Sequence, residues 1–259
     1  MFRSFVRSAP VALAAASALA FAVAPTAHAS HRTVTECSGG MLASGDYYEV
    51  VVHGTCHVPD GASVTVETQL YVTPGSTLDA VSTAKVHVKG NLQVGRDAVL
   101  GLGCNSETNC ASPTTDEVDG NINSAYSTAV ILHSDTVKGD ITTLNDGPGL
   151  NCAPSSQVSA ITRLGKTPAY DAFEDNWVGG YITSSGLRSC WMGMERNHVG
   201  TNILVSDNST ADPDGNEVAA NHANGDLGCY GNSPEAQFGD GPHIPNSVNG
   251  TKLGECSSL

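Results

Sequence analysis

The sequence is poor in aromatic residues, in charged residues and above all in positive charge. Aromatic residues make up 5% of the 259 residues and charged residues 15%, so neither large aromatic clusters nor ion-pair networks can dominate its stability. Lys and Arg total 12 against 26 Asp and Glu, which gives a formal net charge of −14 at pH 7. Nucleic acids and anionic membrane surfaces are bound through Lys- and Arg-rich surfaces, so we expect neither partner.

Motifs for nucleophilic or phosphate chemistry are also missing. The chain contains neither a G-x-S-x-G nucleophile motif nor a phosphate-binding Gly-rich loop. Asn145-Asp146-Gly147 is faintly similar to a motif of pectin-degrading hydrolases, but their Gly-His-Gly and Arg-Ile-Lys elements are absent. The cysteines form no C-x-x-C pair and do not stand near His at zinc-site spacing, so no cofactor is expected from them.

The first 29 residues predict a secretory signal peptide. Arg3 and Arg7 precede an Ala-rich apolar stretch at 11–23, and Ala27-His28-Ala29 has the small-x-small pattern of a cleavage site. The apolar stretch is shorter than the roughly 20 residues needed to cross a bilayer, and no later segment could anchor the chain. We therefore expect a secreted, extracellular protein that does not insert into a membrane.

The sequence does contain a repeat: an apolar residue, any residue, Gly, usually a polar residue, then an aliphatic residue. Complete copies begin at Val88, Val118, Val137, Val178, Val199 and Ala223, and a degraded copy begins at Val248. The intervals fall near one or two periods of about 20 to 25 residues, which is typical of a stacked repeat array. Within each copy, apolar and polar residues alternate as in a β-strand.

These strands predict the fold. Turn-forming residues separate the copies and leave little room for an amphipathic helix. A unit of short strands can bury its inner face only by stacking on its neighbours. We predict an all-β, right-handed parallel β-helix as a single domain over 30–259, with an N-terminal cap at about 30–58. The Gly of each copy is expected at an inward corner, where it lets the coil bend and tolerates a positive φ. A β-sandwich is the alternative, but hairpin dipeptides between matched strands are scarce.

Stacking also suggests how the cysteines pair. An even number of cysteines in an exported chain indicates disulfides, although eight cysteines allow 105 pairings. Residues one period apart become neighbours along the stack, about 4.8 Å apart, so a pair near each end could bridge adjacent coils. One further pair would close a short loop, and the last two cysteines remain for each other. The expected pairs are Cys37 with Cys56, Cys104 with Cys110, Cys152 with Cys190, and Cys229 with Cys256.

Several segments resemble secreted actinobacterial proteins that are themselves predicted to be right-handed β-helices. The similar segments are the V-x-G-N-[IL] strands, Val99-Leu100-Gly101-Leu102-Gly103-Cys104, Arg196-Asn197-His198-Val199-Gly200, Asp212-Pro213-Asp214-Gly215-Asn216-Glu217-Val218 and Gly231-Asn232-Ser233-Pro234. The resemblance covers roughly residues 60–256. It implies the β-helical fold and export, and it implies no activity.

The most regular polar feature is an outward column formed by Asn91, Asn121, Asp140, Tyr181, Asn202 and Asp226. Stacked Asn side chains can hydrogen-bond along the axis and stabilise the coils. The functional alternative is a sugar-binding strip, because carboxamides and carboxylates suit hydroxyl groups, but the column lacks flanking aromatic residues.

Two other groups are candidate sites. Oxygen ligands at alternate positions of a loop, with a Glu beside them, would suit Ca²⁺; the alternative is a solvated acidic turn. These residues are Asp212, Asp214, Asn216 and Glu217. A second group places a tryptophan near charged residues and could bind a carbohydrate or peptide chain; alternatively, Trp191 plugs a loop near Cys190. That group consists of Arg188, Trp191, Glu195, Arg196 and His198.

From the sequence we expect a secreted, noncatalytic β-helix with a structural or binding role at the cell exterior, with a carbohydrate or cell-wall polymer as partner. The alternative is an extracellular polysaccharide lyase or hydrolase that uses outward carboxylates and calcium. Glycoside hydrolysis requires two carboxyl groups held across the scissile bond. Outward Asp140 has no clear carboxylate partner in the sequence, which favours the noncatalytic function.

Overall fold

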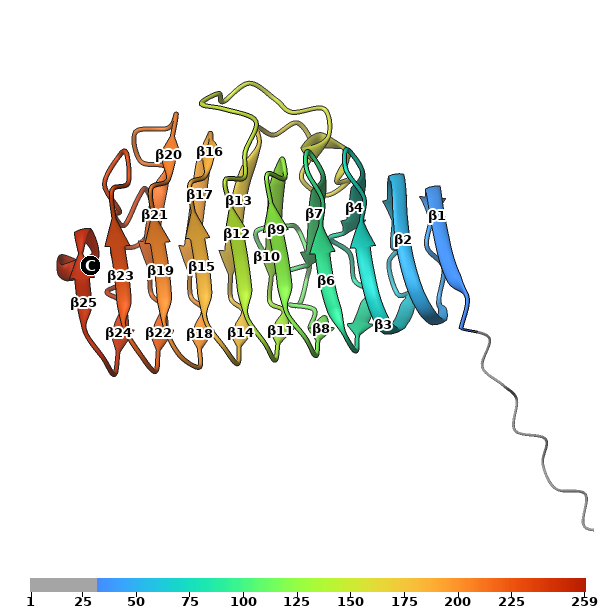
Figure 1. The fold of residues 1–259 in the computed structure, drawn as a ribbon. Helices are drawn as coiled ribbons and strands as arrows, with labels where there is room; N and C mark the ends of the chain where they lie inside the picture. Colours follow the sequence, from blue (N-terminus) through green and yellow to red (C-terminus); the bar gives the residue numbers. More distant parts are fainter. Residues whose placement is uncertain (1–31) are drawn as a thin grey trace, which may run out of the picture. The chain divides into compact units, whose positions relative to one another are not determined.

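The computed structural model describes residues 32–259, and the predicted signal peptide at 1–29 lies outside the described residues. Short strands stack side by side along one axis in this part of the chain (Figure 1). Every ladder between its named strands is parallel, for example β10 with β13 and β19 with β23. The structure therefore confirms the predicted parallel β-helix and excludes the antiparallel β-sandwich. No helix among residues 32–259 is long and apolar enough to cross a membrane.

Most coils consist of a strand of four or five residues, a two-residue strand and a further strand of four. The strands are β1 (Val34–Met41), β2 (Gly45–His57), β3 (Ser63–Val72), β4 (Thr77–Ala80), β5 (Lys85–Val88), β6 (Asn91–Val94), β7 (Val99–Gly103), β8 (Glu117–Val118), β9 (Ile122–Ala125), β10 (Ala129–His133), β11 (Thr136–Val137), β12 (Ile141–Leu144), β13 (Tyr170–Glu174), β14 (Trp177–Val178), β15 (Ile182–Ser185), β16 (Arg188–Ser189), β17 (Trp191–Glu195), β18 (His198–Val199), β19 (Ile203–Ser206), β20 (Ser209–Thr210), β21 (Asn216–Ala219), β22 (His222–Ala223), β23 (Leu227–Tyr230), β24 (Ser247–Val248) and β25 (Lys252–Gly254). Two short 3₁₀ helices are η1 (Val158–Ala160) and η2 (Glu255–Ser258). The region predicted as a cap, 30–58, contains β1 and β2, which continue the parallel stack.

The core is a column of aliphatic side chains inside the coils. Ile141 is in register with Ile182, Ile182 with Ile203, and Ile203 with Leu227. All four are at most 1% exposed. The predicted alternation is therefore correct: one side chain of each pair enters the interior and its neighbour points outward.

The structure requires the repeated Gly for a different reason from the one predicted. Gly120 and Gly139 do not have a positive φ. A Cβ on Gly139 would overlap the Gly120 carbonyl oxygen and Oδ1 of Asn121 in the preceding coil. The glycine is thus required by close approach between coils, and the expected tolerance of positive φ is not used.

The outward column of polar residues forms a side-chain-to-backbone ladder. Oδ1 of Asn91 accepts the N–H of Asn121 at 2.9 Å, and Oδ1 of Asn121 accepts the N–H of Asp140 at 2.9 Å. Asp140 in turn accepts the N–H of Tyr181 at 3.0 Å. These contacts satisfy the backbone donor of the residue that follows each Gly, which supports a structural role for this column.

A second ladder, which we call the inner ladder, is buried at another corner of the coils. Its members lie in register on successive coils: Val86, Asp116, Asp135, Asn176, Asn197, Asn221 and Asn246. Nδ2 of Asn176 donates to Oδ1 of Asn197 at 3.0 Å, and the same contact recurs from Asn197 to Asn221 at 2.9 Å. Each Nδ2 also donates to a backbone carbonyl of the preceding coil, Leu132 in the case of Asn176. Such fully satisfied amides can be buried at little net cost.

Four disulfides join the expected cysteine pairs. Their Cα–Cα distances are 6.3 Å for Cys37–Cys56, 5.9 Å for Cys104–Cys110, 4.7 Å for Cys152–Cys190 and 5.2 Å for Cys229–Cys256. All four expected pairs are confirmed, the two end pairs inferred from the stacking as well as the other two. The first pair links β1 to β2, and the last links β23 to η2.

One insertion covers part of the outer surface. The segment between β12 and β13 carries η1 and places Val158 and Ile161 in a second apolar cluster with outward side chains such as Ile131 and Ala172. This cluster lies outside the coil interior, and Tyr170 and Trp191 pack at its edge. The insertion therefore buries a face that the strand pattern alone would leave exposed.

Candidate functional site

Three ring-bearing side chains follow one another on successive coils. Trp177, His198 and His222 begin β14, β18 and β22 and are in direct register. The rings of Trp177 and His198 are stacked, with centroids 4.4 Å apart and planes 10° apart, and those of His198 and His222 lie 5.8 Å apart. We call these three residues the aromatic stripe. Trp177 is 62% exposed.

The local sequence explains the stripe. In each of these strands the second residue enters the coil interior, so the first points outward. Parallel pairing then sets the rings one coil apart, close to the spacing at which aromatic faces stack. The buried Asn before each ring is hydrogen-bonded into the inner ladder, and this fixes the backbone that carries the ring.

The stripe borders a surface hollow of about 590 Å³. Its other lining residues are Thr136, Val137, Lys138, Val178, Gly179, Val199, Gly200 and Asn224. The two glycines remove side chains beside the rings, whereas the valines point into the coil interior and are at most 3% exposed. An exposed ring face beside an open, largely apolar hollow suits the apolar face of a sugar ring, with a few polar groups at its rim. We call this the aromatic hollow.

A second hollow of about 460 Å³ adjoins the first. It is lined by Glu107, Asp175 and Arg196, and it shares Thr136 and Trp177 with the aromatic hollow. Asp175 and Arg196 occupy corners with φ near +59° and +55°, directly after β13 and β17. We call it the acidic hollow.

Arg196 is the centre of a carboxylate cluster. Its Nη2 lies 2.7 Å from Oε1 of Glu107 and 3.2 Å from Oε2 of Glu174, and its Nε lies 2.8 Å from Oδ1 of Asp175. Nη1 also pairs with Glu195. One guanidinium thus faces four carboxyl groups, and the cluster keeps an excess of negative charge.

This excess shifts the ionisation of the cluster. A hydrogen bond with Glu174, together with desolvation, raises the pKa of Glu107 to about 7. Burial tends to raise the pKa of Glu174, but its contacts with His133, Glu107 and Arg196 together outweigh burial and lower that pKa. Nδ1 of His133 lies 3.3 Å from Oε2 of Glu174, and both side chains are almost fully buried. The two carboxyl groups thus have divergent pKa values, raised for the exposed Glu107 and lowered for the buried Glu174.

The five residues predicted as a binding group do not form one site. Glu195 and Arg196 touch, at the edge of the acidic hollow. His198 belongs to the aromatic stripe on the next strand, whereas Arg188 lies exposed on β16. Trp191 packs edge-to-face on Tyr170, with centroids 5.4 Å apart and planes at 62°, against the second apolar cluster. Trp191 therefore serves packing under the insertion, which was the alternative for it.

The residues predicted to bind Ca²⁺ are used in other contacts. Oδ1 of Asp212 accepts the N–H of Asp214 at 3.1 Å, which forms a local turn. Buried Asn216 donates to the Pro234 carbonyl at 2.7 Å. Burial and a hydrogen bond to Glu195 raise the pKa of Glu217 to about 8. Asp212, Asp214 and Glu217 are not among the described acidic and His groups that lie close enough to share a metal ion.

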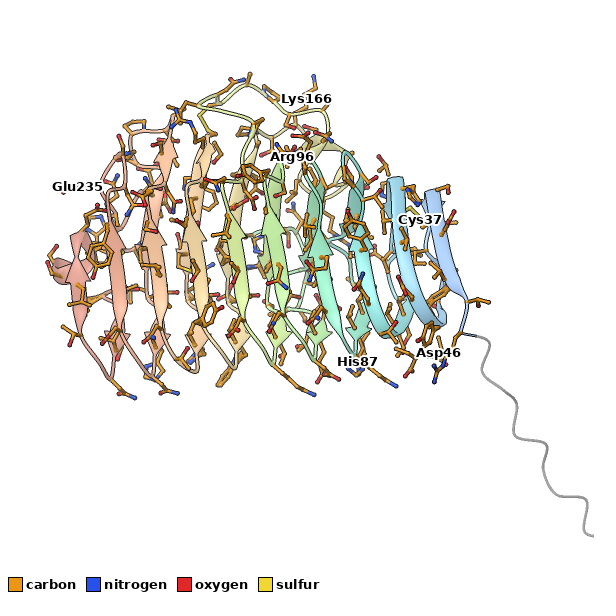
Figure 2. All side chains as sticks on the ribbon, viewed as in Figure 1. Cys37, Asp46, His87, Arg96, Lys166 and Glu235 are labelled. Carbon is orange, nitrogen blue, oxygen red and sulfur yellow. A yellow bond between two sulfur atoms is a disulfide. The ribbon has the colours of Figure 1, made fainter. Side chains whose placement is uncertain are left out.

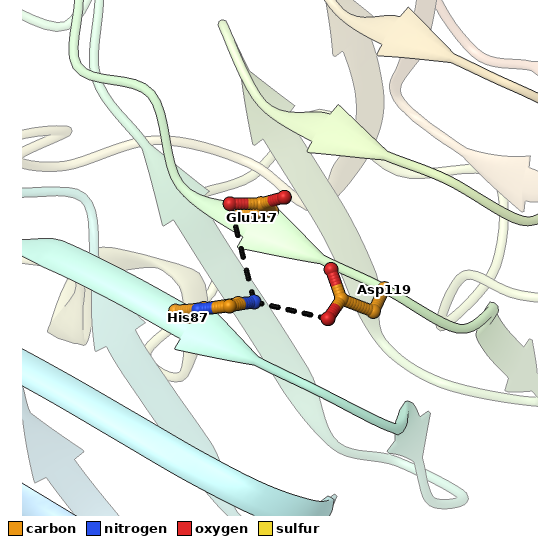
Figure 3. A group of neighbouring side chains, drawn as sticks. All are labelled: His87, Glu117 and Asp119. Carbon is orange, nitrogen blue, oxygen red and sulfur yellow. Dashed lines mark hydrogen bonds and ion pairs between the residues drawn. The ribbon is translucent and has the colours of Figure 1, made fainter.

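One such group does exist, formed by His87, Glu117 and Asp119 (Figure 3). Nε2 of His87 lies 3.2 Å from Oδ2 of Asp119 and 3.9 Å from Oε2 of Glu117. Nζ of Lys138 lies 2.7 Å from Glu117 and 2.8 Å from Asp119. The lysine hydrogen bond lowers the pKa of Asp119, so the ammonium already supplies the positive charge that a cation would bring. This group anchors Lys138 at the rim of the aromatic hollow.

Sequence reasoning missed His222, Trp177 as a stripe member, and Glu107. The available signal was the ring-bearing residue directly before the repeat's Val or Ala in three copies: Asn176-Trp177-Val178, Asn197-His198-Val199 and Asn221-His222-Ala223. No protein-family model matches the chain, and no curated protein or solved structure does either. The functional argument therefore depends on the geometry of the two hollows.

Proposed function

We propose that the protein is a secreted, noncatalytic β-helix that binds a carbohydrate polymer at the cell exterior through the aromatic stripe. The observation that carries this proposal is the stack of Trp177 and His198 beside an open, largely apolar hollow. The four disulfides fit an oxidising compartment, in agreement with the signal peptide predicted at 1–29. The sequence resemblance to exported actinobacterial β-helices supports the same location.

The position of Trp177 supports an extended ligand. His198 covers one face of the Trp177 ring, and the opposite face lies on the side of Thr136, where the two hollows adjoin. The backbone under the stripe is held by the inner Asn ladder, so the rings are positioned before a ligand arrives. Such preorganisation reduces the entropy lost on binding.

The test is calorimetric titration with soluble oligosaccharides, selected first on a glycan array. Trp177→Ala should lower affinity at least tenfold, because an exposed aromatic face is a typical anchor of such sites. Tyr181→Ala is the matched control, since Tyr181 is 41% exposed and borders a separate hollow with Thr183 and Leu204. Equal losses in the two variants, or none in Trp177→Ala, would contradict the proposal.

The alternative, a polysaccharide hydrolase, is favoured by one observation only. Glu107 shares a hydrogen bond with Glu174 beside Arg196, and carboxyl groups with divergent pKa values are typical of acid–base pairs. A reducing-end assay and an assay for unsaturated products, each with and without Ca²⁺, distinguish the two functions. We expect no turnover; turnover that is lost in Glu107→Gln would establish the enzyme instead.

A further inference from the structure

The two hollows meet at one residue. Trp177 lines both the aromatic hollow and the acidic hollow, and Thr136 does the same. A polymer stacked on Trp177 therefore has the acidic hollow directly beside its bound sugar. Whatever that sugar carries at its edge faces the carboxyl groups around Arg196. Figure 2 shows the side chains of the described residues on the ribbon.

The carboxyl groups nearest to solvent are Glu107 and Asp175. Their side chains are 54% and 34% exposed, whereas Glu174 is 3% exposed. Arg196 offers one positive charge to all of them, so the hollow has negative charge left over. A cationic group on the ligand would remove it, whereas a neutral amide could not form the charged pair.

We propose that the polymer bound at the aromatic stripe carries free amino groups, as in a de-N-acetylated glucosamine chain, with the sugar on Trp177 and its ammonium paired with Glu107 and Asp175. This inference rests on the proposed function. The aromatic hollow supplies contact area that is independent of charge. The acidic hollow selects for ammonium-bearing sugars over their N-acetylated counterparts.

The probes are a β-1,4-linked glucosamine hexamer and its fully N-acetylated counterpart, titrated by calorimetry at low salt and again in 0.5 M NaCl. The glucosamine hexamer should bind about tenfold more tightly at low salt, which is the size expected of two partly exposed ion pairs. Salt should remove most of this preference, because it screens charges at the surface. It should leave the binding of the N-acetylated hexamer nearly unchanged.

The diagnostic variant is Glu107→Gln combined with Asp175→Asn. Asn tolerates the positive φ of position 175, so the corner should keep its backbone. The matched control is Asp207→Asn combined with Glu235→Gln: both residues are exposed, and Asp207 has the same kind of corner, with φ 55°. Both double variants replace one Glu and one Asp by their amides, so they alter long-range attraction in the same direction. Thermal melting of each variant reports whether it folds.

In the variant with Glu107→Gln and Asp175→Asn, the ratio of affinities for the glucosamine and N-acetylated hexamers should fall three- to tenfold. The control variant should keep that ratio. If the unsubstituted protein binds both hexamers equally through Trp177, the amino-sugar inference is wrong and the proposed function stands. If the variant with Glu107→Gln and Asp175→Asn behaves like the control, the carboxyl groups do not select the ligand and the inference is equally wrong. If neither hexamer binds and no other glycan does, the proposed function fails with it.

Discussion

Replacing Asp135 with Asn should stabilise the protein, because the following coils already carry Asn at this place in the inner ladder. Asp135 is fully buried, and neither of its carboxyl oxygens has a hydrogen-bond partner. Its N–H donates to Oδ1 of Asn176 at 2.9 Å. An amide at position 135 could donate to that same oxygen and to the carbonyl of Leu102, which is in register with Leu132.

The increase in the free energy of unfolding can be estimated from the hydrogen bonds of the neighbouring coils. Nδ2 of Asn176 makes two hydrogen bonds, at 3.0 Å to Asn197 and 3.1 Å to Leu132. A buried hydrogen bond is worth about 1 kcal/mol net, so two new ones amount to about 2 kcal/mol. Burial, and then the charge of Asp116, raise the pKa of Asp135, so the substitution also removes an acid that would have to ionise inside the coil at high pH. The gain should therefore be larger at pH 8 than at pH 5.

The unsubstituted protein should itself become less stable across this range. Burial raises the pKa of Asp116 to about 7, against 3.8 for an ordinary Asp. A carboxyl group whose pKa is higher in the folded than in the unfolded protein contributes stability that is fully present below the unfolded pKa. That contribution is lost as the pH rises through the folded pKa, and here it amounts to about 4 kcal/mol in total. Groups with lowered pKa values, such as Glu174 and Asp60, lose their contribution only at more acidic pH.

The assay is urea denaturation of both proteins at pH 5 and pH 8 with the disulfides kept oxidised. Asp207→Asn is the control, because it makes the same chemical change at an exposed position. The reasoning would be refuted if Asp135→Asn were destabilising at pH 8. It would also be refuted if the unsubstituted protein were as stable at pH 8 as at pH 5.

Three further substitutions test the coil. Asn197→Ala should lower the free energy of unfolding by about 3 kcal/mol, because it leaves buried amides unpaired on both sides; urea denaturation would show this, and a loss below about 1 kcal/mol would argue against the ladder. Gly139→Ala should cost at least about 2 kcal/mol through its overlap with Asn121, so an unchanged melting temperature would contradict the close approach. Removing the 38-residue bridge with Cys152→Ser and Cys190→Ser should cost about 4 kcal/mol in the chain-entropy model, measured by melting; an unchanged stability would show that the insertion is ordered without it.

The fold could be predicted from the sequence because the repeat and the alternation of apolar and polar residues in each strand identify the same inward positions. Once Val137, Val178 and Val199 are placed in register, the interior and the two end cysteine pairs follow from the stacking. The inner ladder could not be predicted in this way. Asn176 and its counterparts are polar, and alternation alone assigns polar residues to the outside; only a closed coil shows that their amides satisfy one another.

The candidate site was predictable only in part. Parity places Trp177 and His198 outward, but the 41-residue interval that precedes the copy at Val178 conceals that Thr136 is Trp177's neighbour in register. Glu107 reaches Arg196 across 89 residues, because the loop closed by the second disulfide folds over the strands. Contacts made by insertions have no periodicity, so no pattern in the repeat could indicate them.

The two acids of the inner ladder are not equivalent, and the reason lies in the loop that interrupts the stack. Oδ1 of Asp116 accepts the N–H of Val86 at 2.7 Å, and its Oδ2 accepts the N–H of Gly103 at 3.2 Å. Gly103 ends β7 with φ +71°, directly before the loop that separates it from β8. Two backbone donors thus converge on one side chain, and an amide could accept only one of them without presenting its own N–H groups to the other. Asp116→Asn should therefore be less favourable than Asp135→Asn, because only Asp116 already has a backbone donor on each carboxyl oxygen.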